Sequence, residues 1–204
     1  MKDLGQGGAG RQHRRHRILR PTPNTCAMPT TIAFLRAINV GGRFLKMATL
    51  QAHFETLGCT GVRTYINSGN VIFETRARSL PRLAQTLEDG LEPLLGFRSE
   101  VFLRTPAQLQ QIAQRATAHR AAVPPEGEVN VAFLSAPLNE AHTAALDTLK
   151  TTLDDFACEG SEVYWLCRGR QSDSKFSNAS FERRLQQRAT FRRQRMLAGL
   201  AATL

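Results

Sequence analysis

The sequence predicts an α+β fold made of two small lobes, and three features of the chain support this fold class. Strand-like and helix-like hydrophobic patterns alternate from residue 28 to the end of the chain. Each helical stretch carries a single apolar stripe, so each helix is expected to cover one face of a sheet. The 204 residues are 42% hydrophobic and 22% charged, a globular composition at a length that suits two lobes sharing a core.

The first lobe, residues 28–104, is predicted to follow the order strand, helix, strand, strand, helix, strand. Strands are expected at 31–38, 62–66, 71–73 and 99–104, with helices at 47–57 and 80–94. The sequence Asn67-Ser68-Gly69-Asn70 joins the two middle strands and is typical of a hairpin. Ser79 and Pro81 open the second helix, and Gly96 ends it. This βαββαβ order is that of a ferredoxin-like lobe.

The second half, residues 105–204, alternates in the same way but less clearly. Thr105 and Pro106 are predicted to open its first helix. Further elements are expected as a strand at 129–134, a helix at 139–153, paired strands at 155–158 and 162–167, and helices near 178–187 and 192–204. We interpret this half as a related α+β lobe followed by C-terminal helices. A duplication of the first lobe would explain the alternation, although no residue-level repeat is visible in the sequence.

The formal net charge of +10 is concentrated in two segments. Residues 1–27 have a net charge of +5 and residues 168–195 of +7, which leaves −2 for the rest of the chain. Residues 1–27 are rich in Gly and Arg and are expected to form a disordered leader, a composition shared by transit peptides and nucleic-acid-binding arms. We favour a mis-called start instead, because Met28 is followed at once by a strand pattern.

Cysteine usage and hydropathy indicate the compartment. The four cysteines (Cys26, Cys59, Cys158 and Cys167) form no CxxC pair, and no apolar run approaches the length of a membrane-spanning helix. We therefore expect a cytoplasmic protein with reduced thiols and no membrane partner. Cys59 and Cys167 stand at apolar positions and are predicted to be packed thiols.

Two polar, glycine-bearing loops are the first candidate for a ligand site. Arg36 precedes the turn Asn39-Val40-Gly41-Gly42, which would present backbone N–H groups to a phosphate. Turns that need glycine only for their backbone angles have the same sequence, but two such loops in one lobe favour a ligand. The predicted ligand contacts in these loops are Arg36, Asn39, Gly41, Gly42, Lys46, Ser68 and Asn70.

The cations near the C-terminus are the second candidate. On one continuous helix, Arg184, Arg188, Arg192 and Arg195 would share a face, which would suit a phosphate backbone. A solvated helix face has the same pattern, so both interpretations stay open. Lys175 and Arg192 are predicted as anion contacts, and Arg184, Arg188 and Arg195 as nucleic-acid contacts.

Signals for catalysis are few in this sequence. The five histidines lack metal-ligand spacing, and no HExxH or GxSxG motif and no paired carboxylates occur. We therefore expect neither a metal nor a cofactor.

Three segments together resemble one protein family. They are LRAINVGG at 35–42, TYINSGNV at 64–71, and Ser174-Lys175 with Glu182-Arg183. On these motifs the chain from about residue 28 onward is similar to the family known as domain of unknown function 1697. The resemblance implies a two-lobed α+β fold with a ferredoxin-like part, and it implies no particular reaction. The chain departs from the family at Ala37, where glycine is usual, and at 193–196, where amide and aromatic groups are replaced by more positive ones.

Two functions from different classes follow from these observations. The first is a non-enzymatic protein that binds an anionic partner, either nucleic acid or a phosphorylated ligand. The alternative is an enzyme that acts on a small phosphate- or carboxylate-bearing metabolite in a cleft between the lobes. Docking of a basic helix on an acidic protein is a third interpretation. We favour binding over catalysis, because cationic and amide groups abound whereas no nucleophile–base pair is visible.

Overall fold

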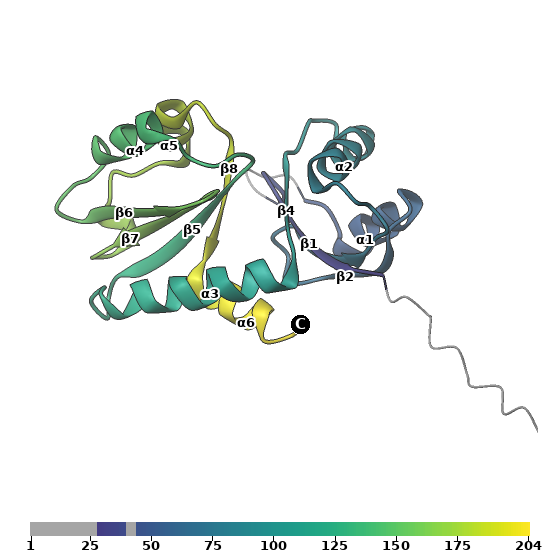
Figure 1. Cartoon of the computed structure of the whole chain (residues 1–204), viewed down its shortest axis with the longest axis horizontal. Helices are drawn as coiled ribbons and strands as arrows, with labels where there is room; N and C mark the ends of the chain where they lie inside the picture. Colours follow the sequence, from purple (N-terminus) through teal and green to yellow (C-terminus); the bar gives the residue numbers. More distant parts are fainter. Residues whose placement is uncertain (1–27, 40–43) are drawn as a thin grey trace, which may run out of the picture.

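Two four-stranded antiparallel sheets organise the chain in the computed structural model, which describes residues 28–39 and 44–204 (Figure 1). Helices pack on both sheets, so the predicted α+β class with two lobes is confirmed. The predicted leader, residues 1–27, lies outside the described residues.

The first lobe has the βαββαβ order that the sequence predicts. Its elements are β1 (Thr30–Leu35), α1 (Met47–Thr56), β2 (Thr60–Thr64), β3 (Asn70–Glu74), α2 (Leu80–Leu95) and β4 (Val101–Arg104). The strands lie in the order β2-β3-β1-β4. Local signals set the helix limits: the Ser79 side chain caps α2, and Gly96 ends it in the left-handed conformation. Leu50, Phe54 and Leu87 of α1 and α2 pack on one face of this sheet.

The second lobe repeats the scheme behind a long connecting helix, α3 (Pro106–Ala121). Its other elements are β5 (Glu128–Leu134), α4 (Glu140–Asp147), β6 (Asp154–Glu159), β7 (Glu162–Cys167), the short η1 (Gln171–Asp173), α5 (Asn178–Leu185), β8 (Ala189–Arg193) and α6 (Gln194–Ala201). The strand order β6-β7-β5-β8 matches the first sheet, with β5 in the place of β1 and β8 in the place of β4. Thr105 caps α3 in a reciprocal capping box with Gln108.

The helix expected to reach residue 153 ends earlier, at Asp147. The Thr151 hydroxyl accepts hydrogen bonds from the amides of Leu153 and Asp154. These local bonds compete with helical pairing of the same amides, so the chain turns into β6.

The two predicted C-terminal helices form as α5 and α6, but the unpredicted strand β8 lies between them, so the C-terminal arginines do not belong to one continuous basic helix. Gln186 adopts a left-handed conformation with φ 49° and ends α5, after which β8 pairs with β5. Arg184 therefore lies on α5, Arg192 on β8 and Arg195 on α6. These arginines do not share one helical face.

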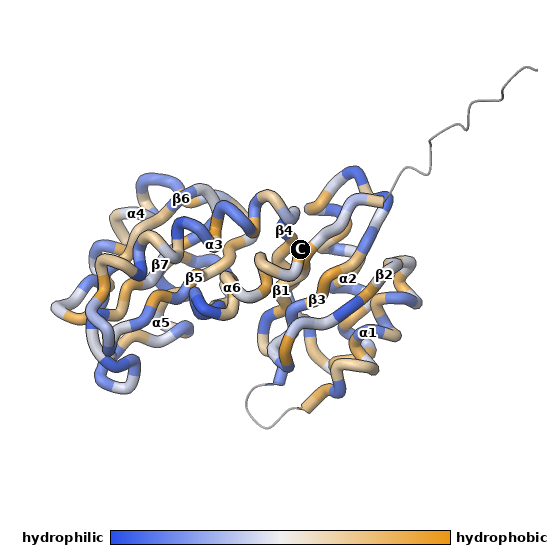
Figure 2. Tube along the Cα trace, turned by 90° about the horizontal axis from the view of Figure 1, so that it is seen from below, coloured by the Kyte–Doolittle hydropathy of each residue, from blue (hydrophilic) through white to orange (hydrophobic). Residues whose placement is uncertain are grey.

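One apolar core joins the two lobes. One face of each sheet, α3 and α6 all contribute side chains to the same buried cluster. Phe34 of β1 and Phe133 of β5 stack across the boundary, with ring centroids 4.2 Å apart. Figure 2 shows α6 lying between β5 and β1, where Leu197 and Leu200 enter this cluster. The lobes therefore form a single packed unit.

The described ranges contain no helix with the length and apolar character that a bilayer crossing requires.

Candidate functional site

A pocket of about 430 Å³ lies between the two lobes, beside the end of β1. Its wall is formed by residues 35–38, Ser68, Asn178, Glu182 and residues 189–192. Three predicted ligand contacts, Arg36, Ser68 and Arg192, meet at this wall although they come from both ends of the chain. Because both lobes contribute, the pocket depends on the packing of the lobes against each other.

Arg192 carries a buried positive charge. Its guanidinium donates to five neutral oxygens, which are Asn70 Oδ1 (2.6 Å), Thr190 Oγ1 (2.8 Å) and the carbonyls of Leu35, Ser68 and Phe191 (2.9 Å each). Among the described residues no carboxylate forms an ion pair with it, and burial lowers the pKa of Arg192 to about 10. The side chain therefore stays protonated at neutral pH and places an uncompensated charge beside the pocket.

Arg36 shows the opposite arrangement, because two carboxylates compensate its charge. Its guanidinium donates to the two oxygens of Glu182 at 2.8 and 2.9 Å and to Glu100 at 3.3 Å. The hydrogen bonds to Glu182 raise the pKa of Arg36. Burial alone would raise the pKa of Glu182, but hydrogen bonds from Arg36, the Ala189 amide and Arg188 outweigh burial and hold it below its ordinary value.

Asn39 and Asn70 fix the two loops around the pocket. Asn39 accepts a hydrogen bond from the Leu45 amide at 2.7 Å and donates to the Asn67 carbonyl at 3.0 Å. Asn70 is fully buried and donates to Ser68 Oγ at 2.9 Å while its carbonyl oxygen accepts from Arg192. Both residues hold backbone and side chains in place without lining the pocket.

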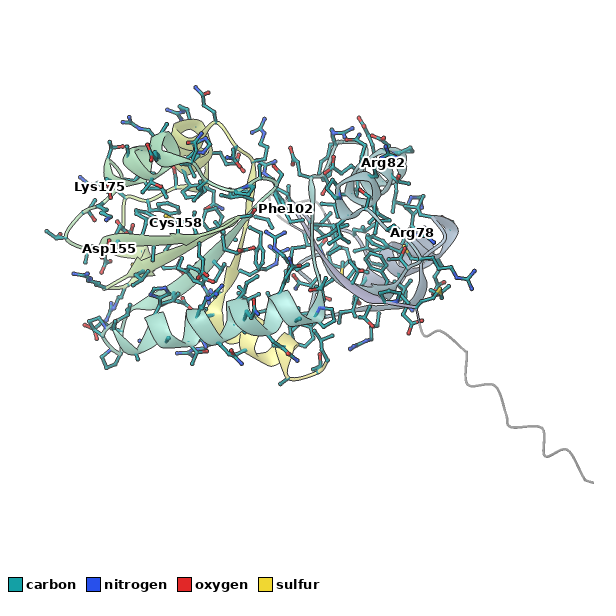
Figure 3. The ribbon with its side chains drawn as sticks, in the orientation of Figure 1. Arg78, Arg82, Phe102, Asp155, Cys158 and Lys175 are labelled. Atoms are coloured by element: carbon teal, nitrogen blue, oxygen red, sulfur yellow. The ribbon has the colours of Figure 1, made fainter. Side chains whose placement is uncertain are left out.

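The other predicted contacts do not line this pocket. Gly41 and Gly42 fall outside the described residues. Lys46 and Lys175 are exposed and lie off the wall, and Figure 3 shows Lys175 on the outer side of the second lobe, apart from Phe102 of β4. The predicted nucleic-acid contacts Arg184, Arg188 and Arg195 are all exposed, on α5, on the α5–β8 loop and on α6.

Arg104 at the end of β4 is a structural counterpart of Arg192 that sequence reasoning missed. It donates to Glu162 at 2.6 Å and to the Leu134 carbonyl at 3.2 Å, both in the other lobe. Its guanidinium carbon lies 5.4 Å from the Phe133 ring centroid, and that of Arg192 lies 5.7 Å from Phe34. An arginine that ends an apolar strand, the signal that singled out Arg36, would have found Arg104 as well.

The pocket offers little for acid–base chemistry. Glu182 is the one acid among the described lining residues, and its lowered pKa makes it a poor proton acceptor. Cys59 and Cys167 are buried as predicted, and burial raises the pKa of Cys59 to about 11. Within residues 28–39 and 44–204, no group of three or more His, Cys, Asp or Glu side chains could hold a metal ion.

Comparison with solved structures gives a similar fold. The conserved bacterial protein SP0830 from Streptococcus pneumoniae superposes with a TM-score of 0.58 at 21% sequence identity, covering 86% of this chain and 98% of that chain. Identity at this level shows the fold alone. No curated protein matches the chain.

A family model gives the sequence relationship. The model described as "Protein of unknown function (DUF1697)" matches residues 28–164, which is more than half of the chain. This range contains the LRAINVGG and TYINSGNV segments at the ends of β1 and β2. The chain therefore belongs to the DUF1697 family.

Proposed function

We propose that this protein binds a small anionic ligand, bearing a carboxylate or a phosphate, in the pocket between the lobes. The supporting observation is the buried Arg192 charge, which borders the pocket and forms no ion pair with a described carboxylate. A buried charge without a counter-charge is costly, so an anion in the pocket would offset that cost. Because the N–H groups of Arg192 are all engaged, the Ser68 hydroxyl and the Asn178 amide on the wall would donate the hydrogen bonds.

A small ligand fits these features better than nucleic acid does. The exposed arginines of the C-terminal region lie on different elements, whereas a nucleic-acid surface needs a row of cations that follows the phosphates. Arg188 and Arg193 are also partly compensated, by Glu182 and Glu128. Binding is favoured over catalysis, because Glu182 is held by Arg36 and the wall supplies no other described acid.

Isothermal titration calorimetry with benzoate and with phenyl phosphate tests this proposal, alongside fluorescence anisotropy with a mixed-sequence oligonucleotide. We expect binding of at least one small anion with a shallow dependence on salt, since a single charge is involved. Arg192→Gln should abolish this binding, whereas Arg184→Gln, which removes an exposed cation of α5, should retain it.

The opposite pattern would overturn the proposal. Steeply salt-dependent binding of the oligonucleotide that Arg184→Gln removes and Arg192→Gln retains would assign the anion site to the exposed surface. If Arg192→Gln does not fold, Ser68→Ala takes its place, with a loss of at least about tenfold in affinity expected for one hydrogen bond to a charged group.

A further inference from the structure

Two arginine contacts cross the boundary between the lobes, and we name them by their positions. The first clamp is Arg104 with Glu162, and the second clamp is Arg192 with Asn70. In each clamp an arginine of the last strand of one lobe reaches the third strand of the other lobe. Each arginine also lies over a phenylalanine ring of the other lobe. The clamps therefore run in opposite directions across the same boundary.

The strand registers show that the two clamps occupy equivalent positions. In the first sheet Ile32 pairs with Arg104, and in the second sheet Val131 pairs with Arg192. Two residues further along each central strand, Phe34 pairs with Asn70 and Phe133 pairs with Glu162. The register thus matches residue by residue: the arginines correspond, the stacked phenylalanines correspond, and Asn70 corresponds to Glu162.

The equivalent clamps differ in charge at one position. Glu162 is a carboxylate and compensates Arg104, in a salt bridge of 2.6 Å whose side chains are nearly buried. Asn70 is an amide, one methylene shorter than Glu162. Its carbonyl oxygen accepts a hydrogen bond from Arg192 but leaves the positive charge of Arg192 uncompensated. The remaining charges at the pocket, Arg36 and Glu182, compensate each other. Among the described lining residues, the wall therefore carries a net charge of about +1, from the uncompensated guanidinium of Arg192.

We propose that Asn70 is the residue that sets the charge selectivity of the pocket: its amide, in the place of the carboxylate of the first clamp, leaves one positive charge for a ligand with one negative charge. This inference rests on the proposed function. The apolar lining from Leu35, Ala37, Ile38 and Phe191 indicates that the ligand has an apolar body attached to that charge. Asn70 acts through Arg192, so it is a positioning residue.

Asn70→Asp tests the inference with three matched probes: benzoate with one negative charge, neutral benzamide, and phenyl phosphate. The titrations are run near pH 8, where a phosphate monoester with a second pKa of about 6 is doubly charged. The wild-type protein should bind benzoate more tightly than phenyl phosphate or benzamide. Asn70→Asp should lower the affinity for benzoate at least about tenfold, because the new carboxylate compensates the charge of Arg192. The affinity for benzamide should not change. Glu162→Gln, the reverse exchange at the equivalent position of the first clamp, should leave benzoate binding unchanged, because Glu162 does not line the pocket.

The outcomes separate this inference from the proposed function. If the wild-type protein binds none of the anions, the proposed function and this inference both fail. If the wild-type protein binds benzoate and Asn70→Asp binds it equally well, the pocket is an anion site and the role of Asn70 is wrong. If Asn70→Asp lowers the affinity for benzoate and for benzamide by the same factor, the loss does not depend on the charge of the probe. In that case the proposed role of Asn70 in charge selectivity is also wrong.

A measurement without ligand checks the charge pairing itself. An aspartate paired with Arg192 has its pKa lowered below the ordinary value of about 3.9. The stability it contributes is present above that value and is lost as the pH falls through the lowered pKa. The melting temperature of Asn70→Asp relative to wild type should therefore fall as the pH is lowered from about 6 to about 3. A difference that stays constant with pH would show that the new carboxylate does not pair with Arg192.

Discussion

At the scale of single residues, Ala37 holds a backbone conformation that alanine rarely adopts. Its φ is 60°, in the left-handed region, at the turn that follows β1. A Cβ atom in this region is strained, and glycine has no such strain. The resemblance to the family indicates glycine at this position, so this chain keeps the turn with a less suitable residue.

We predict that Ala37→Gly stabilises the protein by up to about 1 kcal/mol, because relief of the strain exceeds the added flexibility of the unfolded chain. Ala118→Gly is the matched control, since Ala118 is exposed within α3 and glycine there should cost about 1 kcal/mol. Urea unfolding of both variants measures the two changes. Equal destabilisation by the two substitutions would show that the turn does not strain Ala37.

Residue identity predicted part of the candidate site. Arg36 and Ser68 were predicted as contacts from their places beside or in a polar turn, and Arg192 as one of the cations near the C-terminus. All three line the pocket. The ion pair that occupies Arg36 comes from Glu182, which lies 146 positions away. No local pattern predicts such a contact, because it depends on how the lobes pack. The difference in charge between the equivalent residues Asn70 and Glu162 could not be predicted either, because their equivalence also depends on how the lobes pack.

At the scale of elements, helices with local caps were predicted well and the strand β8 was not. Ser79, Gly96 and Thr105 set the limits of α2 and α3 through hydrogen bonds or backbone angles of neighbouring residues. The five residues of β8 include two exposed or half-exposed positions and three arginine or threonine side chains, so they lack an apolar strand pattern. Pairing with the central strand β5 makes them a strand, which is a tertiary effect that propensity does not contain.

Glu182 on α5 forms an ion pair with Arg36 of the first lobe. From this contact we predict how the stability of the protein depends on pH. The pKa of Glu182 lies below its ordinary value because of its hydrogen bonds from Arg36, the Ala189 amide and Arg188. A lowered pKa means that the ion pair stabilises the fold above the unfolded pKa of about 4.3 and is lost as the pH falls through the folded value. Glu182→Gln should cost about 1–3 kcal/mol near pH 7, with a smaller cost below about pH 4.

Urea unfolding of the wild type and of Glu182→Gln at a series of pH values measures this prediction. The difference in unfolding free energy between the two proteins should become smaller as the pH is lowered. Glu55→Gln provides the control, since Glu55 is exposed on α1 and takes part in none of the ion pairs found among the described residues. Its effect on stability should be small, because an exposed carboxylate without an ion pair contributes little to folding. A cost for Glu182→Gln that is the same at acid and neutral pH would contradict the assigned role of the ion pair.

At the scale of the whole molecule, the two lobes share both a topology and a core. The sheets have equivalent strand orders, and the equivalent residues Phe34 and Phe133 stack on each other at the boundary. A duplication of one βαββαβ unit, followed by divergence, would leave this arrangement. The repeat is visible in the strand order and register of the two sheets but not in the sequence. Core packing constrains the position and volume of a side chain more strictly than the identity of the residue.

Because the two lobes share a core, we predict that they unfold together in one transition. Leu87 is fully buried in the first lobe, and Leu87→Ala should cost about 2–5 kcal/mol through lost burial and the cavity it leaves. Trp165, the single tryptophan of the chain, lies in the second lobe in a cluster that does not include Leu87. If the lobes unfold together, Leu87→Ala should move the urea midpoint of Trp165 fluorescence as far as the midpoint of far-UV circular dichroism.

The equivalent substitution in the second lobe completes this experiment. Leu185 is fully buried on α5 in the same apolar cluster as Trp165, so Leu185→Ala should move both midpoints by a similar amount. Independent lobes would give a different pair of results: Leu87→Ala would leave the Trp165 transition in place and split the circular dichroism curve into two steps. The arginine clamps and the stacked phenylalanines both cross the lobe boundary, and breaking the first lobe alone would expose both. We therefore expect a single transition, and with it a ligand pocket that forms only when the whole molecule is folded.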